Sequence, residues 1–319
     1  MELRNFGRLG RISALTLGGG GIGGVWGTTD RREAVATVHA ALDAGITMLD
    51  LAPSYGAGFE AEQVAGEALR SASVPAEVMI TSKVGLPDDT ERDLAFGARI
   101  RRGLHASLDR IGRTHLDLFL LHTQIRALSP VPETIGWDEY QEAAAEFERL
   151  RDEGLIRAWG ITAVGHPERV LAALGDTPRP DAAQVVVNAL DLNGYWYFNG
   201  VRPESDEIVQ RANENGVSVM GIRAVAAGAL TTSIDRPMTA TDPVAADFAR
   251  AVSFRKLAAD WGTTPAALAH RYALSVPGVP TVVLGVKNRS ELDECLAAEA
   301  AGPLSGAELD TLRALRAAR

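Results

Sequence analysis

Residues 45–55 read GITMLDLAPSY, an apolar run with a single acid, Asp50, that breaks at Pro53 and ends in Tyr55. Such a run is typical of a strand that is buried on both faces, as in a parallel sheet. We therefore expect Asp50 at the carboxyl end of a strand and Tyr55 in the following loop. An acid inside such a strand is costly unless another group pairs with it. Asp50 could instead cap the next helix, because Asp is common at helix N-termini.

Seven further apolar runs alternate with segments of helical spacing along the chain. These predicted strands are Leu15–Leu17, Val78–Ser82, Leu116–Leu121, Ile156–Thr162, Ala183–Val187, Val217–Ile222 and Thr281–Leu284. Strict alternation of strands and helices predicts a parallel sheet, and eight such units predict an α/β fold of the (β/α)8 TIM barrel type. A doubly wound open sheet is the competing architecture.

The segments between these runs have the apolar spacing of helices. The predicted helices are Asp30–Ala44, Glu60–Arg70, Arg92–Ile111, Asp138–Arg151, His166–Leu174, Glu204–Asn213, Val244–Trp261, Pro265–Leu274, Ser290–Ala298 and Ser305–Ala317. Asp30 is the expected N-cap of the first helix. A short hairpin is predicted from Leu3–Phe6 and Arg11–Ala14, and extra helices follow the last strand. Because no linker interrupts the pattern, residues 1–319 are expected to form a single domain.

Composition limits the classes of function. Apolar residues make up 46% of the 319 residues, and the net charge of −9 argues against a nucleic-acid partner, which needs basic surface. Cys295 is the only cysteine, which excludes an intrachain disulfide and a cysteine-based metal cluster. No apolar run approaches the roughly 20 residues of a membrane span, and the N-terminus lacks the apolar segment of a secretory signal. We therefore expect a cytoplasmic protein with no membrane partner.

Ionisable side chains follow three consecutive predicted strands. Asp50 and Tyr55 follow the second strand, Lys83 the third and His122 the fourth. The carboxyl ends of all strands of a (β/α)8 barrel meet on one face, so these four groups should lie together. Each one alone has an ordinary alternative: a solvated lysine, a hydrogen-bonded histidine or an aromatic residue at the rim. Their common location favours a catalytic site.

Proton donation to a carbonyl oxygen needs such a set of groups. A phenol is a weak acid at neutral pH, and a nearby ammonium favours its ionised form and makes it a better donor. Asp50 would hold Lys83 in its charged form, and His122 could hydrogen-bond the substrate oxygen and orient it. The sequence shows no nucleophile–base pair and no His-x-His metal spacing, so no metal is expected. The reducing agent must come from a cofactor.

The chain resembles the aldo-keto reductase superfamily. The matching segments cover nearly the whole chain in the family's order: the glycine-rich first loop, GITMLDLAPSYG, ITSKVG, LDLFLLH, GLIRAWGIT, GVSVMGIRAVAAGAL and VVLGVKNRSELDECL. The resemblance implies that Tyr55 is the general acid, that Asp50 and Lys83 tune it, and that His122 positions the carbonyl. It also implies hydride transfer from a nicotinamide at the barrel mouth and a small carbonyl or alcohol substrate. The substrate, the direction of reaction and the oligomeric state stay open.

The same resemblance implies a set of cofactor-binding residues. They are Gly19, Gly20, Asp50, Thr162, Gln184, Ile222, Arg223, Ala227, Gly228, Leu230, Gly285, Val286, Lys287, Arg289 and Glu294. Lys287 and Arg289 are cations two residues apart, which suits a 2′-phosphate, so NADPH is preferred over NADH. Two exposed charges at the start of a helix are the alternative interpretation.

Three positions depart from the family pattern. Ala163 replaces an asparagine, Ile222 replaces an aromatic residue that stacks on the nicotinamide, and Cys295 replaces an asparagine near the adenine. Loss of this stacking and hydrogen bonding should weaken cofactor binding by about 1 kcal/mol at each position.

The glycine-rich stretch Gly18–Gly24 also contains the spacing G-x-G-x-x-G. A dinucleotide-binding Rossmann turn would need a helix to begin there directly. We expect no helix before Asp30, because Val25, Trp26, Gly27 and two threonines come first, and we therefore do not favour this alternative.

The substrate pocket is predicted from residues that follow strand ends. Trp26, Tyr55, His122 and Trp196 are the substrate-binding candidates, and the aromatic cluster around Trp196 could equally pack beneath its own loop. Two other functions remain open. Lys83 could form a Schiff base in a lyase, or the protein could be a noncatalytic, nicotinamide-nucleotide-binding regulatory subunit.

Overall fold

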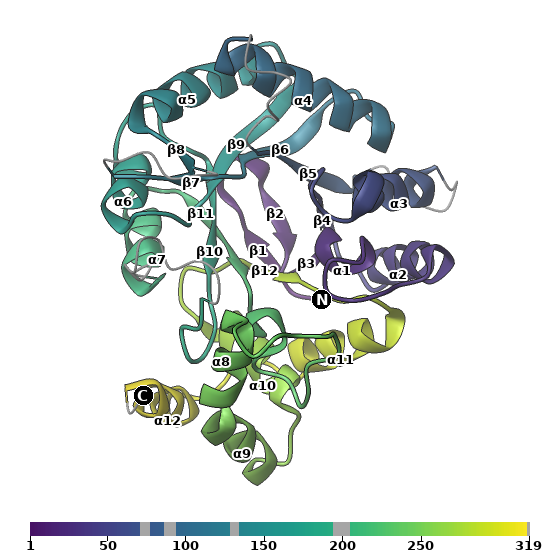
Figure 1. Ribbon diagram of the computed structural model, residues 1–319, viewed down its shortest axis with the longest axis vertical. Coiled ribbons are helices and arrows are strands. Elements are labelled where there is room, and N and C mark those ends of the chain that lie inside the picture. The colour runs from purple at the N-terminus through teal and green to yellow at the C-terminus, as the bar shows by residue number, and fades with distance from the viewer. Residues whose placement is uncertain (71–76, 86–93, 128–133, 194–204, 318–319) are drawn as a thin grey trace.

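Eight parallel strands close into a barrel in the computed structural model, which describes residues 1–70, 77–85, 94–127, 134–193 and 205–317 (Figure 1). Around the ring the strands are β3 (Leu15–Gly18), β4 (Met48–Asp50), β5 (Met79–Val84), β6 (Leu116–Leu121), β9 (Ile156–Thr162), β10 (Ala182–Val186), β11 (Ser218–Ile222) and β12 (Thr281–Leu284). β12 pairs with β3 and completes the ring. The predicted (β/α)8 barrel is confirmed, and the open-sheet alternative is wrong.

Helices surround the barrel on its outside (Figure 1). They are α2 (Arg31–Asp43), α3 (Glu60–Leu69), α4 (Phe96–Ile111), α5 (Trp137–Asp152), α6 (Pro167–Gly175), α7 (Ser205–Glu214), α10 (Pro265–Ser275) and α11 (Arg289–Ala300). Asp30 caps α2 as predicted, because its carboxylate accepts hydrogen bonds from the backbone N–H groups of Arg32 and Glu33. No helix among the described residues is long and apolar enough to cross a membrane.

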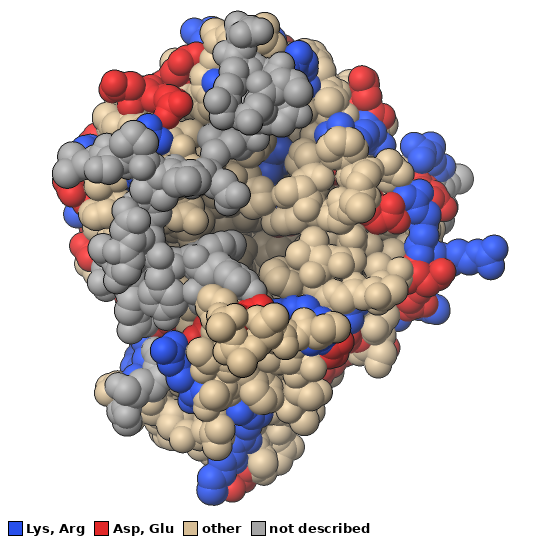
Figure 2. Space-filling model, viewed as in Figure 1, with Lys and Arg blue, Asp and Glu red and all other residues tan. Residues whose placement is uncertain are grey.

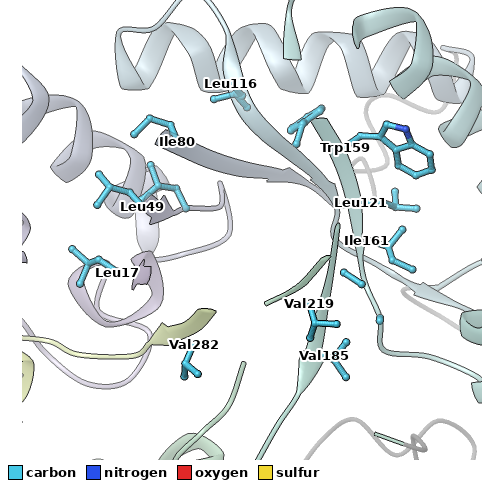
Figure 3. Packing of buried hydrophobic residues seen from close by; sticks show 14 of the residues in the cluster. Leu17, Leu49, Ile80, Leu116, Leu121, Trp159, Ile161, Val185, Val219 and Val282 are labelled. Atoms are coloured by element: carbon cyan, nitrogen blue, oxygen red, sulfur yellow. The ribbon is translucent and has the colours of Figure 1, made fainter. Parts of the chain in front are cut away.

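Side chains of the barrel strands alternate between the surrounding helices and the inside of the ring. Figure 3 shows outward-pointing residues such as Leu49, Ile80 and Trp159, which pack in the largest buried cluster. Inward residues such as Met48 and Leu118 belong to a separate cluster inside the ring. A two-residue period therefore decides which side chains can reach the barrel interior.

The N-terminal hairpin closes the amino-terminal end of the ring. It consists of β1 (Leu3–Asn5), the 3-10 turn η1 (Gly7–Leu9) and the antiparallel strand β2 (Arg11–Ser13). Phe6 lies in the same buried cluster as Met48 and the other inward side chains. The predicted hairpin is present, and it leaves the carboxyl ends of the strands as the open end.

Several short elements differ from the prediction. The expectation of no helix before Asp30 is wrong, because the glycines form one helical turn, α1 (Gly19–Ile22). The strands β7 (Gln124–Ile125) and β8 (Thr134–Ile135) form a small parallel pair after β6. The segment predicted as one helix is divided into α8 (Pro243–Arg250) and α9 (Val252–Asp260). Figure 1 shows these two helices beside the barrel with α12 (Gly306–Ala317).

Candidate active site

A buried ion pair joins β4 and β5 inside the ring. The ammonium of Lys83 donates hydrogen bonds to the Asp50 carboxylate at 2.8 Å and to the backbone carbonyl of Leu51 at 2.7 Å. Both side chains are almost fully buried, with exposed fractions of 0% for Lys83 and 2% for Asp50. Gln184 on β10 donates a further hydrogen bond of 2.8 Å to the same carboxylate oxygen. The costly buried acid therefore has two partners inside the barrel.

Tyr55 and His122 lie beside this ion pair. The Lys83 ammonium is 4.6 Å from the centre of the Tyr55 ring. The Tyr55 and His122 rings are 5.8 Å apart between centres and meet edge to face at 87°. The backbone N–H of His122 donates to the carbonyl of Val84 at 2.7 Å, which fixes the chain where it leaves β6. The structure thus brings together the four side chains predicted as catalytic.

Side-chain alternation explains this convergence. On β4, Met48 points inward, so Asp50, two residues later, also points inward. Lys83 lies within β5, one residue before its end, and pairs in register with the inward-pointing Leu120 of β6. A shift of one residue in either strand would have turned the ion-pair partner toward the helices.

The ion pair keeps Lys83 charged. Burial is the largest single effect and acts to lower the pKa of the Lys83 ammonium, but its interactions with the Asp50 carboxylate and with Tyr55 together outweigh burial, and the net pKa lies above its ordinary value. Burial also raises the pKa of the Tyr55 phenol, and the attraction of the Lys83 ammonium offsets only part of that rise. The phenol therefore keeps its proton at neutral pH. The Lys83 ammonium lowers the pKa of the Tyr55 phenol as expected, but the effect of burial is larger.

His122 is neutral at physiological pH. Burial and then the positive charge of Lys83 lower the pKa of its imidazole to about 3. A neutral imidazole carries one N–H donor and one acceptor nitrogen. It can therefore donate to a carbonyl oxygen without adding a second positive charge beside Lys83.

A cavity of about 790 Å³ opens at the carboxyl ends of the strands and reaches from Tyr55 and His122 to α11. Its volume lies in the range of small-molecule and cofactor sites. Figure 2 shows this hollow near the middle of the face in view, with most charged side chains toward the outer edge. No group of side chains suited to hold a metal ion occurs among the described residues.

Most of the predicted cofactor residues line this cavity. They are Gly20, Asp50, Thr162, Gln184, Ile222, Arg223, Ala227, Gly228, Gly285, Val286, Lys287 and Glu294. Three others are absent from the lining. Gly19 packs against Ala61 of α3, Leu230 is fully buried beneath the loop, and Arg289 forms an ion pair with Glu33 of α2.

The segment from Arg223 to Gly228 has an unusual backbone. Arg223, Ala226 and Ala227 have positive φ angles of 58°, 49° and 54°, a region that residues with a Cβ rarely adopt. Each such residue costs on the order of 1–3 kcal/mol and is typical of ligand-binding segments. Hydrogen bonds within the loop hold this shape, including one from the Gly228 N–H to the Val225 carbonyl at 2.9 Å.

Trp26 lies among the predicted cofactor residues. A methyl group built at Gly20 would come within 2.8 Å of its indole nitrogen, and one at Gly285 within 3.4 Å of its ring. The Arg236 guanidinium lies 5.5 Å from the centre of the indole ring. Trp26 was predicted to bind substrate, as was Trp196, which lies outside the described residues.

The three departures from the family pattern have different surroundings. Ile222 lines the cavity and packs with Val164 and Val186. Ala163 is buried in the main core and is absent from the cavity lining. Cys295 lines the cavity with its sulfur 3.7 Å from Nε2 of His270, and burial raises the pKa of its thiol.

Other residues that line the cavity were not predicted from the sequence. These residues include Ser54, Thr231, Thr232, Ser233, Asp235, Arg236, Thr264, His270 and Glu291. Only Glu291 had a local signal, because it has the opposite charge to Lys287 and follows it by four residues in the sequence. The others depend on loop paths that the apolar pattern does not specify.

Comparisons with a family model and with known proteins give similarities to aldo/keto reductases. The model of the Aldo/keto reductase family matches residues 14–317. Aldo-keto reductase YhdN of Bacillus subtilis (strain 168) is 34% identical over 155 residues, which are 47% of this chain and 43% of that protein. L-galactose dehydrogenase of Arabidopsis thaliana is 25% identical over 321 residues, covering 99% of this chain and 94% of that protein.

The fold has a counterpart among solved structures. The holo form of aldo-keto reductase AKR11C1 from Bacillus halodurans has a TM-score of 0.73 at 23% identity, with 99% of this chain and 96% of that chain covered. This likeness supports the barrel fold over the full length of the chain.

Proposed function

This chain belongs to the aldo/keto reductase family of oxidoreductases, and from that premise we propose that it reduces an aldehyde or ketone to an alcohol, or catalyses the reverse reaction. The single observation that carries the proposal is the buried Lys83–Asp50 pair beside Tyr55 at the end of a cavity large enough for a cofactor. The electron donor in this proposal is a nicotinamide dinucleotide.

The cavity lining suits such a dinucleotide. Thr162 and Gln184 lie near the ion pair and offer a hydroxyl and an amide to a nicotinamide carboxamide. The lining glycines Gly20, Gly228 and Gly285 have no side chain, so a pyrophosphate would lie against backbone at these positions. A bound reduced nicotinamide supplies a hydride to the carbonyl carbon.

In the proposed mechanism, Tyr55 donates its proton to the carbonyl oxygen. Its burial keeps the phenol protonated before substrate binds, and the Lys83 ammonium stabilises the phenolate that forms as the proton leaves. Asp50 holds that ammonium in place. Neutral His122 hydrogen-bonds the same oxygen and fixes its direction toward Tyr55.

A Tyr55→Phe variant tests this mechanism. We expect kcat for carbonyl reduction to fall by about 10²- to 10⁴-fold, the usual range for a lost general acid, with dinucleotide affinity nearly unchanged. The measurement is the absorbance of NADPH and of NADH across a panel of aldehydes, ketones and alcohols. Tyr140→Phe is the matched control, because this buried phenol bonds to the Ala173 carbonyl, away from the site. Unchanged turnover in Tyr55→Phe would refute the proposed role.

NADPH is the first cofactor to test, with NADH second. The sequence-based preference depended on Lys287 and Arg289, and of these only Lys287 lines the cavity. The preference therefore depends on one cation rather than two.

The Schiff-base lyase has less support. Lys83 is charged and donates to both Asp50 and the Leu51 carbonyl, whereas a nucleophilic lysine must be neutral. Borohydride reduction with a carbonyl substrate should leave Lys83 unmodified. A regulatory subunit would bind the dinucleotide without turnover of any compound in the panel, so the same assay separates it from the enzyme.

A further inference from the structure

Lys287, the cavity's candidate cation for a 2′-phosphate, is already paired with two carboxylates. Its ammonium is 2.8 Å from Oε1 of Glu291 and forms a second ion pair with Asp235. Its backbone N–H also donates to Oε2 of Glu291 at 2.9 Å. The Lys287 side chain is only 16% exposed, so little of its charge faces solvent.

The second expected cation points elsewhere. The guanidinium of Arg289 donates to both carboxylate oxygens of Glu33 on α2, at 3.1 and 2.9 Å, and its backbone N–H donates to the same group at 3.0 Å. This interaction lowers the pKa of Glu33 to about 2. Arg289 is absent from the cavity lining, so Lys287 faces the cavity without it.

Carboxylates outnumber cations at this end of the cavity among the described residues. Asp235, Glu291 and Glu294 line it together with Lys287. Two other arginines line the cavity: Arg236, which follows Asp235, donates to the Ala227 carbonyl and faces Trp26, and Arg223 begins the loop segment. A dianionic 2′-phosphate at Lys287 would have to share the ammonium with two carboxylates.

We propose that Asp235 and Glu291 set the cofactor selectivity of this protein, by weakening its affinity for a 2′-phosphate and so allowing NADH to compete with NADPH. The inference rests on the proposed nicotinamide function. A ribose with free hydroxyl groups carries no charge, and its 2′-OH can donate a hydrogen bond to either carboxylate. Like charges a few ångströms apart repel one another more strongly near a protein surface than in bulk water, so each carboxylate should have a measurable effect on the affinity for a 2′-phosphate.

Asp235→Asn and Glu291→Gln test this proposal, because each removes a charge and keeps the size of the side chain. We measure the dissociation constants of NADP⁺ and NAD⁺, and of the fragments 2′,5′-ADP and 5′-AMP, by titration calorimetry. In each variant the ligands with a 2′-phosphate should bind about tenfold more tightly, which corresponds to about 1.4 kcal/mol. NAD⁺ and 5′-AMP should change by less than about threefold.

Two further variants serve as controls. Asp260→Asn removes a carboxylate from an exposed ion pair with Lys256 on α9, which lies outside the cavity. It should leave all four constants unchanged. Arg289→Gln should leave the ratio of NADP⁺ to NAD⁺ affinity unchanged, whereas a tenfold loss for NADP⁺ alone would make Arg289 the phosphate ligand and overturn the inference.

The outcomes separate this inference from the function on which it rests. Wild-type binding of both dinucleotides, with no change of their affinity ratio in Asp235→Asn and Glu291→Gln, overturns the selectivity proposal alone. If a wild-type protein that unfolds cooperatively binds neither NADP⁺ nor NAD⁺, the selectivity proposal and the proposed function are both overturned. Unfolding curves of each variant show whether a change in affinity arises from loss of structure.

Discussion

Lys83 and Asp50 form a buried ion pair, and substitution of one or both residues tests how much each charge contributes to the stability of the barrel. Among the described residues, Lys83→Met leaves the buried Asp50 carboxylate with the hydrogen bond from Gln184, and we expect a loss of about 3–5 kcal/mol in the free energy of unfolding. The double variant Asp50→Asn/Lys83→Met should lose less than the sum of the two single changes. The measurement is urea unfolding of all four proteins.

The matched control for that cycle is the exposed pair Lys256–Asp260. Its side chains are 74% and 56% exposed, so the corresponding Met and Asn changes should cost less than about 1 kcal/mol. Additive losses at Lys83 and Asp50 would contradict a coupled pair.

His122 makes a pH-dependent contribution to stability. Its imidazole has a pKa of about 3 in the folded chain, against about 6.5 when unfolded. Below pH 6.5 the unfolded chain therefore binds the additional proton, and stability falls as the pH falls. Between pH 7 and pH 5 this effect amounts to at most about 2 kcal/mol.

A His122→Asn variant should lose this part of the pH dependence. The measurement is the free energy of unfolding of the wild type and of His122→Asn at pH 7 and at pH 5. The other titrating groups are common to both proteins, so the difference in pH dependence reports on His122. An imidazole signal from His122 that titrates near pH 6.5 in NMR spectra of the folded protein would contradict the expected neutral form.

The N-terminal hairpin is an element with a structural role that can be separated from the site. Phe6 is 2% exposed and fills the end of the ring opposite the cavity. Phe6→Ala should lower the free energy of unfolding by about 3–5 kcal/mol through the cavity that it leaves. Dinucleotide affinity, measured by calorimetry at a temperature where the variant stays folded, should remain unchanged.

Leu3→Ala on the same hairpin is the control. Its side chain is 40% exposed, so its loss should have little effect on stability. Equal losses for the two variants would mean that the hairpin contributes through its backbone rather than through Phe6.

Elements with strong local signals were predictable from the sequence. The cap at Asp30 and the apolar run of β9 depend on residues within a few positions of each other, and β9 has the predicted bounds. The helical turn of Gly19–Ile22 was missed because glycine is a poor helix former. The division between α8 and α9 was missed because Ala251, where they meet, is ordinarily a helix-favouring residue.

The site as a whole was predictable only in part, and for a physical reason. Tyr55, Lys83 and His122 follow from strand ends, because a closed parallel barrel brings those ends together wherever they fall in the sequence. The Arg289 side chain points away from the cavity because it pairs with Glu33, and the positive charge of Lys287 is partly neutralised because it pairs with Asp235. Such contacts between distant segments have no periodic signal in the chain.

Occupation of the cavity should stabilise the whole molecule. A dinucleotide at about 100 times its dissociation constant adds about 2.7 kcal/mol to the free energy of unfolding. Hydrogen exchange should slow in residues 20–26, 223–236 and 285–295, three segments from separate parts of the chain that each contribute residues to the lining of one cavity. Residues 306–317 of α12 are the internal control: they do not line the cavity, and Leu312 is the buried residue of this helix, so its amides should exchange by local opening at a rate that the ligand leaves unchanged. Protection limited to one of the three segments would contradict a single extended site.

The pairing of β12 with β3 has a consequence for synthesis of the protein on the ribosome. β3, the first barrel strand, pairs on one side with β12, the eighth. This side of β3 therefore stays unpaired while more than 260 further residues are being translated. Contacts between such distant segments form slowly, and a strand that waits with an open side can pair with the wrong neighbour. We therefore expect the nascent chain to depend on chaperones until residues 281–284 have emerged, although the finished ring has no free edge.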